Sequence, residues 1–145
     1  MIEIRIDDAA VRAKLTELMR RGMDLTPAMR KAAGIMADAV EENFDQEGRP
    51  KWPSLAAATI KARAKTGNWP GKILQRSGSL AASITRSSDA HQAMAGTNKV
   101  YAAIQHFGGK AGRGHKVTIP ARPFMKLEED DMAKIVKMFE EYLTK

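Results

Sequence analysis

The first residues of the chain alternate between apolar and polar side chains. Isoleucine stands at every second position of residues 2–6 (IEIRI), a period typical of a strand with one buried face. A helical period follows, and its apolar positions are Val11, Leu15, Leu18 and Met19. Asp7 or Asp8 can cap this helix, and Gly22 can adopt the left-handed conformation that ends it. We therefore expect a strand followed by an amphipathic helix.

A second, longer helix is predicted to begin at residue 26. Thr26 precedes Pro27, and an N-cap followed by proline at the first helical position is a common helix start. An apolar stripe with helical spacing then runs through about 18 residues. Its members are Met29, Ala33, Met36, Val40 and Phe44. We expect this stripe to pack into the core, because methionine side chains fill irregular core gaps well.

Glycine and proline interrupt the chain repeatedly between residues 48 and 78. Residues 48–53 (GRPKWP) end the second helix, and Trp52 can lock this bend against the core. Ser54 can cap a short helix over residues 55–64. Because alanine buries little area, we expect this alanine-rich helix to lie on the surface.

The C-terminal half is predicted to hold short strands and a last helix. Residues 80–97 favour strand, turn and strand, while residues 101–107 fit a helix or a strand equally well. Residues 128–131 (EEDD) suit a helix N-terminus. The apolar face behind them is formed by Met132, Ile135, Val136, Phe139 and Leu143. The prediction is a single α+β domain over residues 1–145, with an N-terminal strand and helices, a small antiparallel sheet and a C-terminal amphipathic helix.

Charge is distributed unevenly along the chain. The net charge is +7 overall, but residues 48–127 hold 14 basic residues and one acidic residue, Asp89. The segments before and after this basic, loop-rich middle are each net −3. Such a middle could bind nucleic acid, or it could bind an acidic protein partner, including another copy of this chain. Charge alone leaves both alternatives open.

The sequence lacks the residues that several classes of chemistry require. There is no cysteine, so disulfides and thiolate-bound metals are excluded. His91, His106 and His115 show no ligand spacing, and the common catalytic motifs are missing. Residues 109–114 (GKAGRG) lack the strand-to-helix frame of a phosphate loop. We expect no enzyme, no cofactor and no metal. No apolar run of about 18 residues is present, and the acidic N-terminus does not suit a signal peptide, so no membrane contact is expected.

Residues 101–124 (YAAIQHFGGKAGRGHKVTIPARPF) combine a basic, glycine-rich loop with a stiff proline-containing segment. Glycines at this density indicate a loop whose backbone visits positive φ. Prolines at 120 and 123 bias their preceding residues toward extended geometry. A loop anchored by a stiff segment is a common way to present a contact surface.

Motifs spread over nearly the whole chain carry a family resemblance. They are Phe44…Glu47-Gly48…Pro50…Trp52…Leu55…Thr59, then Ile73-Leu74…Ser77-Gly78…Leu80…Ser83-Ile84, Gly96-Thr97-Asn98…Tyr101-Ala102…Phe107-Gly108-Gly109 and Ile119-Pro-Ala-Arg-Pro-Phe124. The chain resembles the phage virion morphogenesis family, the tail-completion proteins of contractile-tailed phages such as Mu and of related prophages. It departs from the expected order at Gln105-His106, where many members have His-Gln.

The resemblance implies a structural protein of phage assembly that acts at the neck, in tail completion or head–tail joining, through contacts with other tail and neck proteins. It also implies a ring-like homo-oligomer, with the host cytoplasm as the place of assembly and the virion as its destination. The alternative is a DNA-binding protein that uses the surface of residues 48–127.

The predicted partner-binding residues are Lys110, Arg113, His115, Lys116 and Arg122. For the first four, the alternative is a solvated loop without a partner. For Arg122, a local salt bridge that holds the segment is slightly favoured over a partner contact. Trp52 and Trp69 are expected to be structural rather than stacking platforms for bases.

Overall fold

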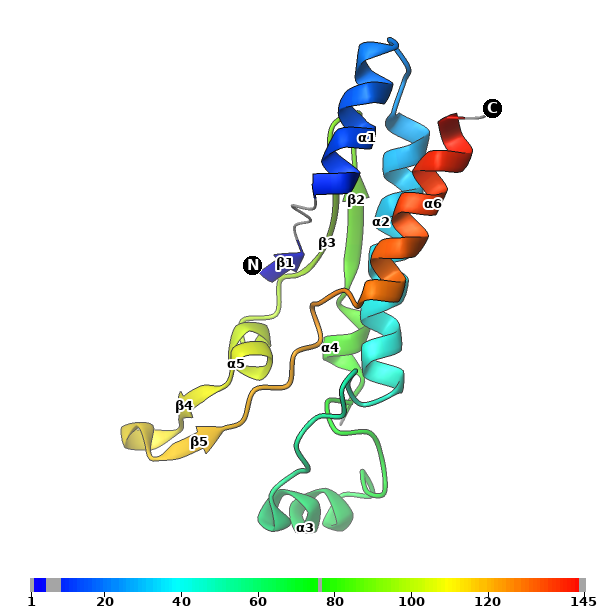
Figure 1. Ribbon diagram of the computed structural model, residues 1–145. Helices are drawn as coiled ribbons and strands as arrows, with labels where there is room; N and C mark the ends of the chain where they lie inside the picture. The colour runs from blue at the N-terminus through cyan, green and yellow to red at the C-terminus, as the bar shows by residue number, and fades with distance from the viewer. Residues whose placement is uncertain (1, 5–8, 76, 144–145) are drawn as a thin grey trace.

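The computed structural model describes residues 2–4, 9–75 and 77–143. Its helices are α1 (Ala9–Arg20), α2 (Thr26–Asp45), α3 (Ala57–Lys65), α4 (Ser79–Ala82), α5 (Ala102–Phe107) and α6 (Glu129–Leu143). Its strands are β1 (Ile2–Ile4), β2 (Thr85–Ser88), β3 (Ala93–Thr97), β4 (Gly109–Ala111) and β5 (Val117–Ile119). The predicted α+β class is confirmed (Figure 1).

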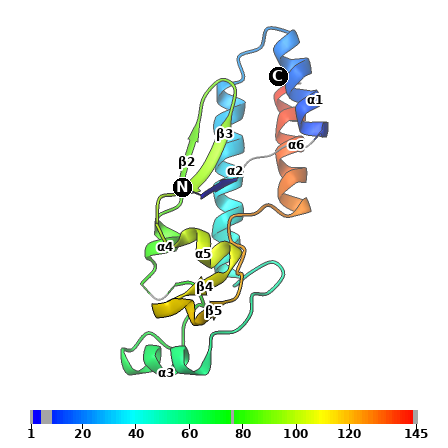
Figure 2. The same ribbon diagram turned by 90° about the vertical axis from the view of Figure 1, so that its left-hand side faces the viewer.

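The longest helix, α2, lies between a sheet and a second helix. The sheet is antiparallel with strand order β1-β3-β2, and Ile2 pairs with Thr97 while Thr85 pairs with Gly96. The strands β2 and β3 pack on one side of α2, and α6 packs along it and also against α1 (Figures 1 and 2). The predicted apolar stripe of α1 is buried at Val11 and Leu18 and half-buried at Leu15, whereas Met19 is 53% exposed, so Met19 does not belong to the core.

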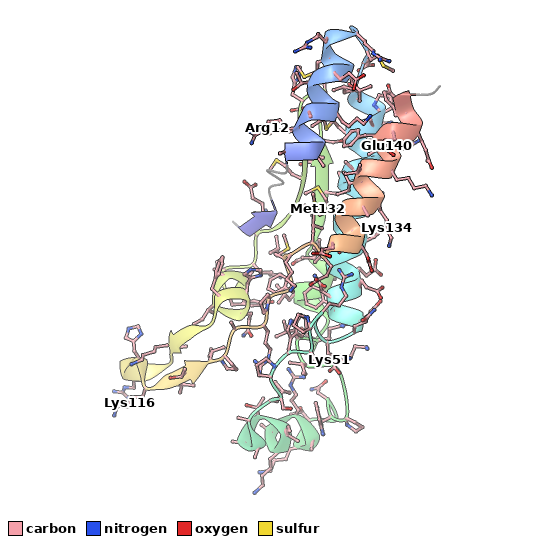
Figure 3. All side chains as sticks on the ribbon, viewed as in Figure 1. Arg12, Lys51, Lys116, Met132, Lys134 and Glu140 are labelled. Carbon is pink, nitrogen blue, oxygen red and sulfur yellow. The ribbon has the colours of Figure 1, made fainter. Side chains whose placement is uncertain are left out.

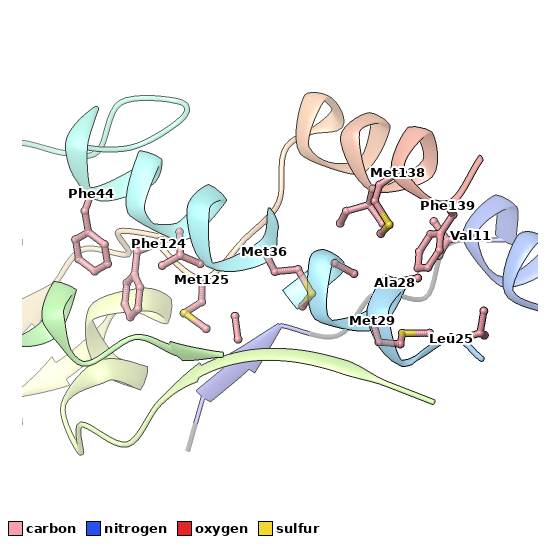
Figure 4. Close-up of a cluster of buried hydrophobic side chains, with 14 of the residues drawn as sticks. Val11, Leu25, Ala28, Met29, Met36, Phe44, Phe124, Met125, Met138 and Phe139 are labelled. Carbon is pink, nitrogen blue, oxygen red and sulfur yellow. The ribbon is translucent and has the colours of Figure 1, made fainter. Parts of the chain in front are cut away.

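The hydrophobic core follows α2 from end to end (Figure 4). Near its C-terminus, Phe44 meets Phe124 and Met125, and near its N-terminus Met29 lies with Val11 and Phe139. The predicted stripe of α2 is confirmed, because all of its members are buried: Met29, Ala33, Met36, Val40 and Phe44. The α6 face is confirmed through Ile135 and Phe139.

The start of α2 differs from the prediction by one residue. Thr26 is the first helical residue and Leu25 occupies the N-cap position, so Thr26 is not the cap. Asp24, the residue before Leu25, satisfies the first backbone N–H of the helix: its Oδ1 accepts a hydrogen bond of 3.0 Å from the Thr26 N–H. The same bond lowers the pKa of the Asp24 carboxyl.

Two other predicted element boundaries shift, and one open assignment is decided. The surface helix runs over α3, with Ala56 rather than Ser54 at its N-cap position. The strand expected from residue 80 begins only at Thr85, because Gly78 at a φ of 75° leads into α4, where Leu80 is buried. The undecided segment 101–107 forms the helix α5.

The N-terminal predictions are settled in part. Gly22 has a φ of 69° after α1, as expected for a residue that ends a helix. The N-terminal strand is observed as β1, whereas Asp7 and Asp8, the two candidate caps, lie outside the described residues. Within the described part of the chain, no helix has both the length and the apolar character to cross a bilayer.

The basic loop is a structured projection. Its two arms pair as the antiparallel strands β4 and β5, with Gly109 opposite Ile119, and a short 3-10 turn at Arg113–His115 forms the tip. We call residues 109–119 the basic hairpin. It extends away from the helical body, on the side opposite α2 (Figure 1).

Candidate interaction surface

Arg122 anchors the base of the basic hairpin to the body. Its side chain is 5% exposed, and Nε and Nη2 donate hydrogen bonds of 3.0 and 2.9 Å to the backbone oxygens of Pro53 and Ser54. Its backbone N–H donates to Gln105 O at 2.9 Å. Burial, and then the positive charge of Arg63, lower the pKa of Arg122. Arg122 therefore holds this segment locally, as expected, but it does so through hydrogen bonds to carbonyl oxygens rather than through a salt bridge.

Trp52 holds the next part of the same segment. Its Nε1–H donates to the backbone oxygen of Pro123 at 3.0 Å. Its ring meets Phe44 edge-on, with centroids 6.0 Å apart, and Phe44 in turn lies 5.2 Å from Phe124. The prediction that Trp52 locks its bend against the core is confirmed, and Trp69 is half-buried in a separate turn.

A buried polar network completes the anchoring, and the sequence did not indicate it. Asn43 is fully buried and donates from Nδ2 to the backbone oxygens of Phe124 and Lys126, at 2.7 and 3.0 Å. Its Oδ1 accepts from Arg49 Nε at 2.7 Å, and Arg49 Nη2 lies 2.8 Å from Asp131 Oδ2. Asp131 thereby joins α6 to the bend after α2. The only sequence signal was a polar side chain, Asn43, beside the apolar stripe.

Two glycines of the family motifs have steric reasons to be glycine. Gly48 has a φ of 101°, and a Cβ there would lie 2.5 Å from the Trp52 ring. Gly108 has a φ of 74°, and a Cβ there would lie 2.7 Å from the backbone nitrogen of Ala121. Both glycines let the 48–53 bend and the hairpin base approach their neighbours closely.

His106 has a structural position. Its Nδ1 accepts a hydrogen bond of 3.2 Å from the Met125 N–H, and its ring packs edge-on against Phe124 with centroids 5.5 Å apart. Burial, and then the charge of Lys126, lower the pKa of His106. The neutral imidazole is therefore the form that holds the 122–126 segment.

The structure gathers four of the five predicted partner-binding residues and separates the fifth. Lys110, Arg113, His115 and Lys116 are all exposed on the basic hairpin, with Lys116 near its tip (Figure 3). Arg122 lies at the hairpin base and its described contacts are internal. Exposed apolar side chains adjoin the hairpin, with Phe107 69% exposed and Val117 57% exposed.

A face of opposite charge lies on α2. It is formed by exposed carboxylates at helical spacing, and its members are Asp38, Glu41, Glu42 and Asp45. We call these four residues the acidic face. Beside it lies a hollow of about 430 Å³, bordered by Glu41 and Asp45 and floored by Phe44, Ala81 and Ile84.

The structure offers no candidate metal site among the described residues. No group of three histidine, aspartate or glutamate side chains is placed among them to bind a metal. A hollow of about 360 Å³ between α3 and the hairpin base is bordered by Arg63 and Arg122, and no carboxylate or imidazole lines it. The arrangement suits contact with another molecule through charge and exposed apolar surface.

Comparison with known proteins agrees with the motif series. The model of the phage virion morphogenesis family matches residues 6–144. This chain belongs to that family.

Three relatives are similar over most of their length. The Mu-like prophage FluMu G protein 2 of Haemophilus influenzae is 43% identical over 143 residues, covering 98% of this chain and 96% of that protein. The putative capsid assembly protein G of Escherichia phage Mu is 29% identical, with 88% and 85% covered. FluMu G protein 1 of Haemophilus influenzae is 31% identical, with 92% and 89% covered. No solved structure matches this chain.

Proposed function

We propose that this phage morphogenesis protein is a structural, non-catalytic component of tail completion or head–tail joining at the neck. Membership of the virion morphogenesis family is the observation that carries the proposal. The fold supports it, because the packed body presents a projecting basic hairpin with exposed apolar side chains on and beside it. Such a projection suits contact with other virion proteins and with further copies of the chain in a ring.

Deletion of the gene from an inducible phage tests this function. Lysates should contain filled heads and complete-looking tails that remain separate, and a plasmid copy of the wild-type gene should restore infectious particles. A plasmid copy with Lys134→Glu, an exposed change on α6, should restore them as well. Normal infectious titres from the deletion phage would refute the proposal.

A DNA contact is the second candidate, favoured by the charge of residues 48–127. If this surface binds phosphates, affinity for a labelled duplex should fall steeply as salt rises, because bound cations displace counterions. Titration at low and moderate salt, with duplex and with single strands, measures this. Absence of salt-sensitive binding at micromolar protein would exclude the DNA-binding alternative.

A further inference from the structure

The basic hairpin and the helix that carries the acidic face lie in different parts of the molecule. In Figure 1 the hairpin extends to the lower left, while α2 lies at the right of the body. Among the described residues, no hydrogen bond or ion pair joins the hairpin to the acidic face of its own chain. Two complementary surfaces that lie apart on one chain can meet between different molecules.

The acidic face carries a repulsion that a cationic partner would relieve. Its members stand at i, i+3, i+4 and i+7 of α2, and like charges at these spacings destabilise a helix. Among the described residues, no ion pair engages these four carboxylates. Lys51 and Lys72 come after α2 in the chain. Instead of pairing with the acidic face, they donate to the backbone oxygens of Gln46 and Asp45 at the C-terminal end of that helix.

The basic hairpin is largely exposed. Most residues of β4 and β5 are exposed, and an isolated two-stranded hairpin is marginally stable in water. Val117 and the adjoining Phe107 expose apolar side chains next to the basic ones. A surface that is apolar as well as cationic fits a protein partner, whose interface core excludes water.

We propose that the basic hairpin of one copy of this chain docks on the acidic face of the next copy. Lys110, Arg113 and Lys116 would pair with Glu41, Glu42 and Asp45, and Val117 would cover the apolar floor of the 430 Å³ hollow. The contact is heterologous, since the hairpin and the acidic face are different surfaces of each copy, and repetition yields a ring or a filament. The inference rests on the proposed function only in taking the chain to be homo-oligomeric.

Two charge-reversal variants test the pairing. The hairpin variant carries Lys110→Glu, Arg113→Glu and Lys116→Glu, and the α2 variant carries Glu41→Lys, Glu42→Lys and Asp45→Lys. All six side chains are exposed, and lysines in the last turns of α2 suit its dipole, so both variants should fold. Circular dichroism and thermal unfolding check the fold.

Self-association is measured by analytical ultracentrifugation of nuclease-treated protein at low salt. Each variant alone should associate at least about tenfold more weakly than wild type, because like charges now face each other. An equimolar mixture of the two should recover association, since each reversed surface finds an opposite partner. A control with Lys134→Glu and Glu140→Lys, on the exposed side of α6, should associate as wild type does (Figure 3).

Cross-linking gives a second, geometric measurement. Because the chain has no cysteine, Arg113→Cys combined with Glu41→Cys introduces the only thiols. Mild oxidation should produce a ladder of dimers, trimers and higher species. Arg113→Cys alone should stop at dimers, and Arg113→Cys with Glu140→Cys should do the same.

Wild-type protein that stays monomeric up to its solubility limit would overturn the proposal. So would variants that associate as wild type does, a mixture that fails to recover, a missing ladder, or association that requires added DNA. Failure of these tests leaves the deletion phenotype untouched, and normal titres from the deletion phage would refute the neck function without affecting the hairpin contact. The two proposals can therefore fail separately.

Discussion

Gly48 illustrates how closely single residues constrain the bend after α2. Its φ of 101° favours glycine, and the Trp52 ring occupies the place of a Cβ. Gly67 also has a positive φ, 75°, but nothing lies within 4 Å of its Cβ position. Comparing substitutions at Gly48 and Gly67 therefore separates the energetic cost of backbone strain from the cost of steric overlap.

Gly48→Ala should destabilise the protein by about 2–4 kcal/mol, because strain at positive φ and displacement of Trp52 add together. Gly67→Ala should cost only about 1 kcal/mol, from strain alone. Urea unfolding followed by tryptophan fluorescence measures both. Equal losses in the two variants would show that the Trp52 contact is unimportant.

His106 gives the protein a pH-dependent stability. Its pKa is lowered in the folded state from an ordinary value of 6.5, so the unfolded chain binds the proton more readily. The free energy of unfolding should therefore fall as pH decreases from about 6.5 through the lowered folded pKa, below which this contribution stays level. Protonation also removes the acceptor for the Met125 N–H.

His106→Asn should flatten this pH dependence, because the asparagine oxygen can still accept from Met125 but does not titrate. Thermal unfolding between pH 5 and about pH 8 measures it. His91→Asn, at an exposed position, is the control and should leave the slope unchanged. If stability depended on pH as steeply in His106→Asn as in wild type, the pH dependence would have to come from other titratable groups.

At the scale of elements, the two amphipathic helices were predictable and the connections between them were not. α2 and α6 carry long apolar stripes whose period is visible in the sequence, and the structure buries the stripe of α2 together with Ile135 and Phe139 of α6. Segment 120–128 has no such period. It is held by the side chains of Asn43, Trp52 and Arg122, which donate to backbone oxygens distant in the chain.

Asn43→Leu should destabilise the protein by about 2–4 kcal/mol, because two backbone oxygens and Arg49 Nε lose their partner in a buried site. Urea unfolding measures the loss. Gln46→Leu, at an exposed position one turn later, is the matched control and should change stability little. A small loss for Asn43→Leu would mean that water replaces the amide.

The Arg49–Asp131 pair should show coupling in a double-mutant cycle. Its side chains are 17% and 4% exposed and approach to 2.8 Å, so Arg49→Met and Asp131→Asn should couple by about 1–3 kcal/mol. The exposed pair Glu17–Arg21 should couple by less than about 0.5 kcal/mol. Additive effects at Arg49 and Asp131 would contradict the inferred tie between α6 and the bend.

At the scale of the whole molecule, the basic hairpin is separable from the core. None of its described residues belongs to the buried cluster. Replacing residues 112–116 with Asn-Gly, a pair suited to a tight hairpin turn, keeps β4 and β5 and removes the basic tip. The thermal midpoint should stay within about 2 °C of wild type, while complementation of the deletion phage should be lost.

Loss of stability in that shortened variant would place the tip within the cooperative fold. Full complementation would instead show that the tip is dispensable for assembly. The Lys134→Glu variant serves again as a control for complementation, since it alters charge on α6 without touching the hairpin.

The sequence by itself determined the α+β class, the stripes of α2 and α6, the anchoring role of Trp52 and the family, because these rest on local period and on motifs in order along the chain. Tertiary structure alone decided how the pieces meet. The Asn43–Arg49–Asp131 network, the carbonyl partners of Arg122 and the pairing of β4 with β5 join residues far apart in sequence or without a local period. The basic loop was visible as charge and glycine, but only the fold showed that it is a hairpin projecting from the body on the side opposite α2.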